Sequence, residues 1–255
     1  YLIIDRCAGT GALEESFSNE MLEHTVLNTV VEAESASLHG MYGDRVLAIL
    51  PENTSTNVNG LFVNGNALEI PFNDELTEFI EGYRATCEED GKALRLIFFE
   101  NPPYAEPGAK RQQDNGKGNK TAGTYIHRLI KQTDIKGRGK TDLANQFIWS
   151  AFNLYDCDHY IVFSPIKYWK SQYIIDEKFI EGFIANRKYF HAGEAGISVI
   201  HWENMHGNIT NEELELEAYD IENNCLVKKD NVIVKKIHNK INDIDFVSQT
   251  KKEYI

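Results

Sequence analysis

The four residues Asn101-Pro102-Pro103-Tyr104 combine side chains that suit chemistry on a planar amine. Such an amine is a poor nucleophile because its lone pair is delocalised into the neighbouring π system. The side-chain oxygen of Asn101 and the carbonyl of Pro102 can accept its two protons, which frees the lone pair. Two prolines stiffen the turn and remove competing N–H donors, and a tyrosine can stack on a flat ring. The motif predicts a site for an aromatic amine or an amide, with a simple proline-rich turn as the alternative.

A glycine-bearing turn, Asp5-Arg6-Cys7-Ala8-Gly9-Thr10-Gly11, lies between an expected strand at 2–4 and an expected helix at 12–22. Parallel sheets hold nucleotide-like ligands at such turns, and Gly9 and Gly11 let the backbone approach a ligand closely. The third position of the dinucleotide pattern is Glu14 here, and the sequence lacks the Lys-Ser/Thr pair of a phosphate loop. The turn therefore favours a nucleotide-like ligand held by neither of those motifs, with a tight turn that binds nothing as the alternative.

A carboxylate at the end of the second strand would accept protons from the hydroxyl groups of a ribose. Glu32 directly follows the β-branched stretch 25–31, roughly 20 residues beyond the glycine turn. Glu32 is predicted to take this role, and Glu34 is the alternative. Either residue could instead be an exposed glutamate at the start of a helix.

The pattern of apolar residues predicts the elements that must position these motifs. Strands are expected at 2–4, 25–31, 61–64, 94–99 and 160–163, and helices at 12–22, 35–42, 74–87 and from 141–142 onward. This alternation is typical of an α/β fold with a doubly wound, mostly parallel sheet. Strand-like segments then follow one another at 182–190, 196–202, 214–221 and 225–236. They predict an antiparallel edge hairpin and a small β-rich C-terminal extension, dividing the chain into 1–205 and 206–255.

The charge of the chain is uneven. Its 255 residues carry a net charge of −13, which argues against a domain that grips nucleic acid unaided, because duplex binding depends on neutralised phosphates. Residues 105–141 reverse this balance, with nine Lys or Arg against three acidic residues, a net charge of +6. The sequence thus predicts that any contact with nucleic acid is concentrated in this segment.

The cysteines and the apolar runs narrow the class of protein further. Four scattered cysteines form no CxxC pair, which predicts reduced thiols in a cytoplasmic protein and no metal site. No apolar run approaches the roughly 18 residues of a membrane helix, so no membrane partner is expected. The chain begins on its first expected strand and ends without an obvious stop, which suggests a piece of a larger protein.

Taken together, the two motifs resemble those of S-adenosylmethionine-dependent DNA adenine-N6 methyltransferases. Residues 5–11 look like the cofactor motif, and residues 101–104 look like the catalytic motif of the amino-methyltransferases. Their order and separation are similar to enzymes that place cofactor binding before catalysis. The resemblance covers residues 1 to about 205. It implies a Rossmann-like class I methyltransferase fold, S-adenosylmethionine as cofactor, and adenine N6 of DNA as the methyl acceptor in a restriction-modification protein.

The resemblance also implies which residues hold the cofactor. The methionine part would lie against Asp5, Gly9 and Gly11, and Glu32 would hold the ribose. Asn66 stands where the family has an Asp that contacts the cofactor adenine, so that match is imperfect. The full implied set of cofactor residues is Asp5, Cys7, Ala8, Gly9, Gly11, Glu32, Asn66 and Asn101.

The catalytic motif and a later aromatic would together hold the target base. Asn101 and Pro102 would accept from the N6 amine, Pro103 would stiffen the turn, and Tyr104 would stack on a base extruded from the duplex. Phe190 matches the aromatic that faces the base from the other side, and a core aromatic is the alternative. Tyr168, beyond the fifth strand, could line the pocket or merely pack.

The basic segment directly follows the catalytic motif and is therefore expected beside the substrate. It would order on DNA phosphates, with an ordinary surface loop as the alternative. The residues expected nearest to DNA are Lys110, Arg111, Lys117 and Lys120, and a recognition domain is expected outside this chain.

Other functions fit the same four catalytic residues. A protein-glutamine methyltransferase or a ribosomal RNA amino-methyltransferase is one alternative, and a non-catalytic binding subunit that keeps the fold is another. DNA adenine is favoured by the basic segment, by the suggestion that the chain is a piece of a larger protein, and by the β-rich extension, which could lead into a target-recognition domain.

Overall fold

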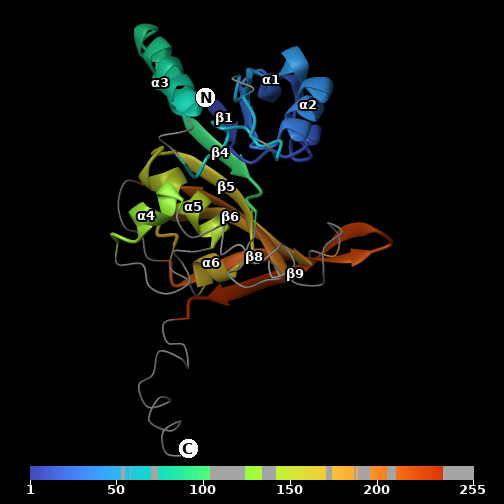
Figure 1. The fold of residues 1–255 in the computed structure, drawn as a ribbon. Helices are drawn as coiled ribbons and strands as arrows, with labels where there is room; N and C mark the ends of the chain where they lie inside the picture. The colour runs from blue at the N-terminus through green and yellow to red at the C-terminus, as the bar shows by residue number, and fades with distance from the viewer. Residues whose placement is uncertain are drawn as a thin grey trace, which may run out of the picture.

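A single mixed sheet organises the protein. The computed structural model describes residues 1–52, 55–57, 59–69, 74–103, 124–133, 142–170, 174–186, 188, 196–205 and 211–237. Within these residues nine strands form one sheet in the order β3-β2-β1-β4-β5-β7-β6-β8-β9 (Figure 1). The strands are β1 (Leu2–Asp5), β2 (Thr25–Asn28), β3 (Ala48–Leu50), β4 (Leu96–Glu100), β5 (His159–Ser164), β6 (Lys178–Asn186), β7 (Gly196–Glu203), β8 (Glu213–Glu222) and β9 (Cys225–Lys235).

The first five strands run parallel and reverse their order of addition at β1. The chain adds β2 and β3 on one side of β1, then returns to place β4 and β5 on the other side. The register pairs Ile4 with Phe98, so β1 and β4 end at the same level of the sheet. At such a reversal the turns that follow the two strands leave a crevice between them, where α/β proteins bind ligands.

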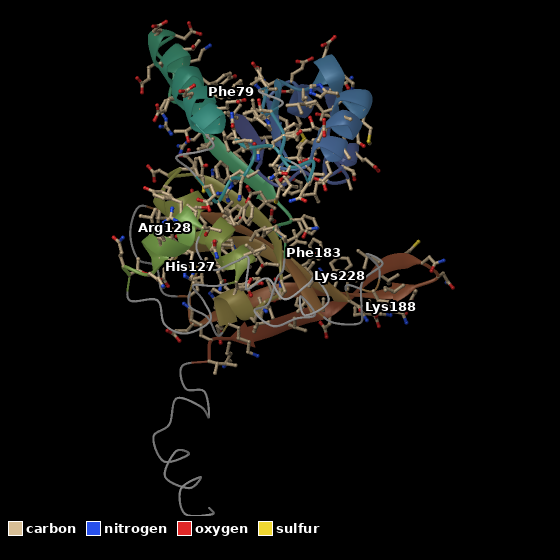
Figure 2. All side chains as sticks on the ribbon, in the orientation of Figure 1. Phe79, His127, Arg128, Phe183, Lys188 and Lys228 are labelled. Carbon is tan, nitrogen blue, oxygen red and sulfur yellow. The ribbon has the colours of Figure 1, made fainter. Side chains whose placement is uncertain are left out.

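Helices cover the parallel strands on both faces, because successive residues of strands such as β1 and β4 are apolar and successive side chains point to opposite faces. On one face α1 (Asn19–Leu22) and α2 (Glu32–Met41) pack on β2 and β3 through Leu38, Leu27 and Ile49. On the other face α3 (Asp74–Glu89) and α5 (Leu143–Asn153) share a core with β1 and β4. In Figure 1 the two groups lie to either side of β1 and β4, and Figure 2 marks Phe79 on α3. None of the helices in the described part combines the length and the apolar character that a membrane crossing requires.

The later strands form the predicted antiparallel edge. β7 pairs antiparallel with both β5 and β6, and β8 and β9 form an antiparallel hairpin. Asn223 and Asn224 turn that hairpin with φ of 52° and 59°, values that asparagine tolerates better than most residues. β8 pairs in parallel with β6, so the predicted β-rich extension continues the same sheet. The predicted mostly parallel sheet with an antiparallel edge is thus confirmed, and the boundary at 205 stays a prediction.

Two local predictions differ from the structure. The strand predicted at 61–64 is wrong: β3 is Ala48–Leu50, and Leu61 and Phe62 form only isolated bridges with Val31 and Thr56. Gly60 and Gly65 flank that apolar stretch, and at Gly65 a side chain would meet the backbone oxygen of Thr29 at 2.6 Å. The stretch is therefore a loop pressed against the end of β2.

The single helix predicted at 12–22 is two short pieces, a 3₁₀ turn at Glu14–Ser16 and α1. Ser18 separates them because its backbone is extended and its hydroxyl caps α1 by accepting from the Met21 N–H at 3.2 Å. The helix start predicted at 141–142 agrees with α5, whose N-cap is Asp142. The remaining short helices are α4 (Tyr125–Ile130) and α6 (Lys167–Lys170).

Candidate functional site

One cavity of about 430 Å³ lies at the carboxyl edge of the sheet, where the order of strands reverses. The turn after β1 contributes Cys7 and Gly9, and the turn after β4 contributes Asn101 and Pro103. The loop that contains Asn66 closes a further side. The structure thus brings the two sequence motifs, which lie far apart in the chain, to the same cavity.

The first turn folds back on itself and exposes only its middle to the cavity. The Cys7 N–H donates to Asp5 Oδ1 at 2.8 Å, and Asp5 is only 1% exposed. Gly9 has a φ of +58° and lines the cavity. Gly11 lies behind it, because a Cβ there would come within 2.4 Å of the Tyr42 ring. Of the turn residues predicted to touch a ligand, Cys7 and Gly9 line the cavity, whereas Asp5, Ala8 and Gly11 support the turn.

The two glutamates that were candidates for a ribose contact take different places. Glu34 lines the cavity, and its Oε2 accepts from the Thr29 hydroxyl at 2.5 Å. Glu32 is the first residue of α2, its N–H donates to the Gly60 carbonyl at 3.0 Å, and it does not line the cavity. The geometry favours the alternative, Glu34, because α2 begins earlier than the sequence indicated and turns the two side chains in different directions.

An apolar wall with an amide edge lies beside Glu34. Asn66 lines the cavity, and its Oδ1 accepts from the Leu68 N–H at 3.1 Å, which fixes the side chain in its turn. The apolar part of this wall is formed by Val30, Val31, Leu61, Ala67 and Leu68. A flat ring could lie against these side chains and meet the amide of Asn66 at its edge.

In the turn after β4, exposed and buried residues alternate. Asn101 and Pro103 are exposed and line the cavity, and Pro102 between them is buried. Tyr104 lies outside the described residues, as do Phe190 and the basic residues Lys110, Arg111, Lys117 and Lys120. The predicted roles of those six residues stay predictions.

The remaining wall comes from the helices that follow β4 in the chain. Thr124, Leu143 and Phe147 line the cavity from α4 and α5. Thr124 donates to Gln146 Oε1 at 2.5 Å and accepts from the His127 N–H at 3.0 Å, which holds α4 against α5. On α4, His127 is buried and Arg128 is exposed (Figure 2).

Tyr168 takes the second of the two places considered for it. It is fully buried, and its hydroxyl donates to Asp142 Oδ1 at 2.9 Å. Asp142 is also the N-cap of α5. Tyr168 therefore packs under α5 and does not line the cavity.

A buried ion pair at the wall of the cavity was missed by sequence reasoning. Arg6 Nε lies 2.5 Å from Glu100 Oε1, Arg6 Nη2 lies 2.8 Å from Glu100 Oε2, and both side chains are fully buried. Burial lowers the pKa of the Arg6 guanidinium, but the Glu100 carboxylate outweighs that effect and leaves the pKa above its ordinary value. The signal available in the sequence was a charged residue at the end of each apolar strand: Arg6 within the first motif and Glu100 directly before the second.

Acidic side chains gather around the first turn. Glu14 is 1% exposed, and burial raises its pKa from 4.5 to about 7. Burial also raises the pKa of Asp5, as do the nearby carboxylates of Glu14 and Glu100. Further negative charge is therefore disfavoured at this end of β1. Among the described residues, no group of three or more His, Cys, Asp or Glu side chains could hold a metal ion.

The sheet and its helices define an α/β protein with a cavity at the switch point of a mostly parallel sheet. No protein-family profile and no curated protein matches the sequence. A cryo-electron microscopy structure of a DrdV–DNA complex matches with a TM-score of 0.51 and 17% identity, over 86% of this chain and 24% of that chain. The ATP-dependent Type ISP restriction-modification enzyme LlaBIII bound to DNA matches with a TM-score of 0.48 and 11% identity, over 86% of this chain and 18% of that one. The chain shares its fold with part of DrdV and spans about a quarter of that protein's length.

The buried Glu14 predicts a specific dependence of stability on pH. Its pKa is raised in the folded chain, so its contribution to stability is complete below pH 4.5 and is lost as the pH rises through about 7. In the wild-type chain this group should lower the free energy of unfolding by about 3 kcal/mol between about pH 4 and pH 8. Glu14→Gln should abolish that decrease. Denaturant unfolding across this range measures the effect. Glu15→Gln, at the exposed neighbouring position, is the matched control, and equal changes in both variants would contradict the assignment.

Proposed function

We propose that this chain binds S-adenosylmethionine in the edge cavity and transfers its methyl group to the N6 amine of adenine in DNA, as part of a restriction-modification protein. One observation carries the proposal: Gly9 of the first motif and Asn101 of the second line the same cavity. A methyl donor held by the first turn would therefore face the acceptor groups of the second.

The charges around the cavity favour a cationic cofactor over a phosphorylated one. Among the described residues the only charged side chains that line the cavity are Arg6 and Glu34, and Arg6 is already bound to Glu100. Asp5 and Glu14 add two buried carboxyl groups behind the first turn. Among the described residues that line the cavity, a pyrophosphate would find no basic side chain other than the paired Arg6, and the nearby carboxyl groups would disfavour it. A sulfonium or an ammonium group would not meet this repulsion.

Three parts of the cavity wall would each hold one part of the cofactor. Cys7 and Gly9 would hold the methionine part, Glu34 would accept from the ribose hydroxyls, and Asn66 with its apolar neighbours would take the adenine. A volume of about 430 Å³ lies within the range of roughly 300–1,000 Å³ typical of small-molecule sites. When bound, the cofactor supplies an electrophilic methyl group.

The second motif would prepare the acceptor. The Asn101 side-chain oxygen and the Pro102 carbonyl would accept the two N–H protons of the target amine and free its lone pair for attack on the methyl group. Pro103 offers no N–H that could compete for these acceptors. The buried position of Pro102 keeps the turn in one conformation, so the acceptors are in place before the base arrives.

DNA is favoured as the substrate by the sequence around the cavity. Pro103 and Thr124 both line the cavity, and they flank in sequence the stretch 104–123, which carries Lys110, Arg111, Lys117 and Lys120. The basic side chains of this stretch would suit contacts with the phosphates on either side of an extruded base. DrdV, with which the chain shares its fold, is a protein in complex with DNA.

Asn101→Ala should abolish catalysis while leaving the cofactor bound. Loss of one preorganised polar contact to the reacting group lowers the rate by roughly 10²–10³-fold. We expect that loss in transfer of labelled methyl groups to adenine in DNA, with a cofactor Kd changed by less than about 3-fold. Asn153→Ala, at an exposed position on α5, is the control. Full activity of Asn101→Ala would refute the mechanism, and methylation of glutamine or RNA instead of DNA would redirect the substrate assignment.

Gly9→Val should prevent the cofactor from binding. Valine strains a backbone with a φ of +58° and fills the space in front of the first turn. We expect the cofactor Kd to rise by at least about 30-fold in calorimetric titration. Gly91→Val is a matched control, because Gly91 has a φ of +70° and open space around it in the turn between α3 and β4. Equal affinities of the two variants would place the ligand elsewhere.

A pair of variants tests which glutamate holds the ribose. Glu34→Gln removes a carboxylate that lines the cavity, so we expect the cofactor Kd to rise by about 10-fold through loss of charge-assisted hydrogen bonds. Glu32→Gln removes the same charge two residues away and should leave the Kd within about 2-fold. The opposite outcome would restore Glu32 to the ribose role.

A further inference from the structure

We infer that Arg6 and Glu100 form a positioning pair that holds the cofactor turn and the catalytic turn at a fixed separation. This inference rests on the proposed function. Neither residue would touch the reacting atoms. Arg6 lines the cavity directly before Cys7, and Glu100 directly precedes Asn101, which also lines it.

The ladder of the sheet does not extend to these turns. Its last registered pair between β1 and β4 is Ile4 with Phe98. Beyond that pair the Arg6 N–H donates to Glu100 Oε1 at 3.2 Å, and the Arg6 guanidinium grips both carboxylate oxygens. Beyond the last backbone pair of the two strands, the side chain of Glu100 therefore links them, and it binds the backbone of the first turn directly.

Further hydrogen bonds fix the orientation of both side chains of the pair. Arg6 Nη1 donates to the Ser150 hydroxyl at 2.7 Å, and Arg6 Nη2 donates to the Phe147 carbonyl at 2.8 Å. The Tyr160 hydroxyl donates to Glu100 Oε2 at 2.7 Å. The guanidinium carbon also lies 4.6 Å from the centre of the Phe98 ring. These contacts join β1, β4, β5 and α5, so neither turn can shift without breaking several bonds to buried charges.

Stability alone does not explain such a pair. An apolar pair of similar volume serves the stability of a core as well as a buried ion pair does, and often better. Compared with an apolar pair, a bidentate arginine–carboxylate contact adds a link of fixed direction between the two side chains. Transfer of a group between two bound molecules needs this kind of link, because small errors in separation lower its rate sharply.

The double variant Arg6→Met/Glu100→Leu separates positioning from stability. It keeps the core filled and leaves no unpaired charge, so we expect a folded chain that binds S-adenosylmethionine within about 3-fold of the wild-type Kd. We expect its kcat for methyl transfer to fall by about 30-fold or more. In the ligand-free chain, hydrogen exchange should become faster at residues 6–9 while β1 and β4 stay protected.

Arg95→Met/Asp158→Leu is the control for loss of an arginine–aspartate pair away from the cavity, and its side chains are partly exposed. Arg95 Nη1 lies 2.8 Å from Asp158 Oδ1, and these residues precede β4 and β5 at the end of the sheet opposite the cavity. This control should keep both kcat and the exchange rates at residues 6–9. Glu100→Gln, which retains acceptor and shape but not the charge, should lower kcat with little change in cofactor Kd, and it decides the question if the double variant does not fold.

The outcomes distinguish this inference from the proposed function. A wild-type chain that binds no cofactor and methylates no amine would refute the proposed function. A wild-type chain that is active, with an unchanged kcat in the double variant or in Glu100→Gln, would show that the pair is only structural and would overturn the inference. A parallel fall in kcat and cofactor affinity would also overturn it, because it would indicate general loosening of the site.

Discussion

The parallel pairing of β1 with β4 is the constraint on which the rest of the site depends. It places two segments that are more than ninety residues apart in the chain at one edge of the sheet. The pairing is stable because Leu2, Ile4 and Phe98 are fully buried under α3 and α5. The intervening strands, β2 and β3, are added outward from β1, so they leave its other side open for β4. The cavity is the space that this order of strands creates.

Buried charge marks the functional end of this pairing. Along β1 and β4 the buried side chains are apolar until Asp5, Arg6 and Glu100, where the strands end. Placing these groups out of water carries a free-energy cost that hydrogen bonds only offset, so a core built for stability alone would not select them. Asn28 adds a second link of the same kind, because its amide donates to the carbonyls of Arg6 and Gly65 at 3.0 Å each. The three loops around the cavity are thus held by polar side chains from inside the core.

The sequence predicted what depends on local pattern and missed what depends on distant partners. Short apolar or β-branched runs located β1, β2, β4 and β5, and successive strand-like segments predicted the antiparallel edge, because each pattern is complete within a few residues. The stretch 61–64 has the same composition as a strand, but its place against Thr29 is set by contacts with β2. The choice between Glu32 and Glu34 required the first residue of α2, and the pairing of Arg6 with Glu100 required the fold itself. Both motifs that line the cavity could be located from sequence, whereas the contacts that fix them could not.

The distribution of charge is compatible with the DNA substrate proposed for this acidic protein. A net charge of −13 would repel a polyanion if it were spread evenly over the surface. The lining of the cavity is instead nearly neutral, since Arg6 is paired with Glu100 and Glu34 is its only other charged side chain among the described residues. A neutral base and a cationic methyl donor can enter such a cavity, while phosphates are favoured only where the net +6 of residues 105–141 is concentrated. In the proposed function, methyl transfer therefore belongs to the cavity and phosphate binding to residues 105–141, while the acidic remainder disfavours binding of DNA elsewhere on the chain.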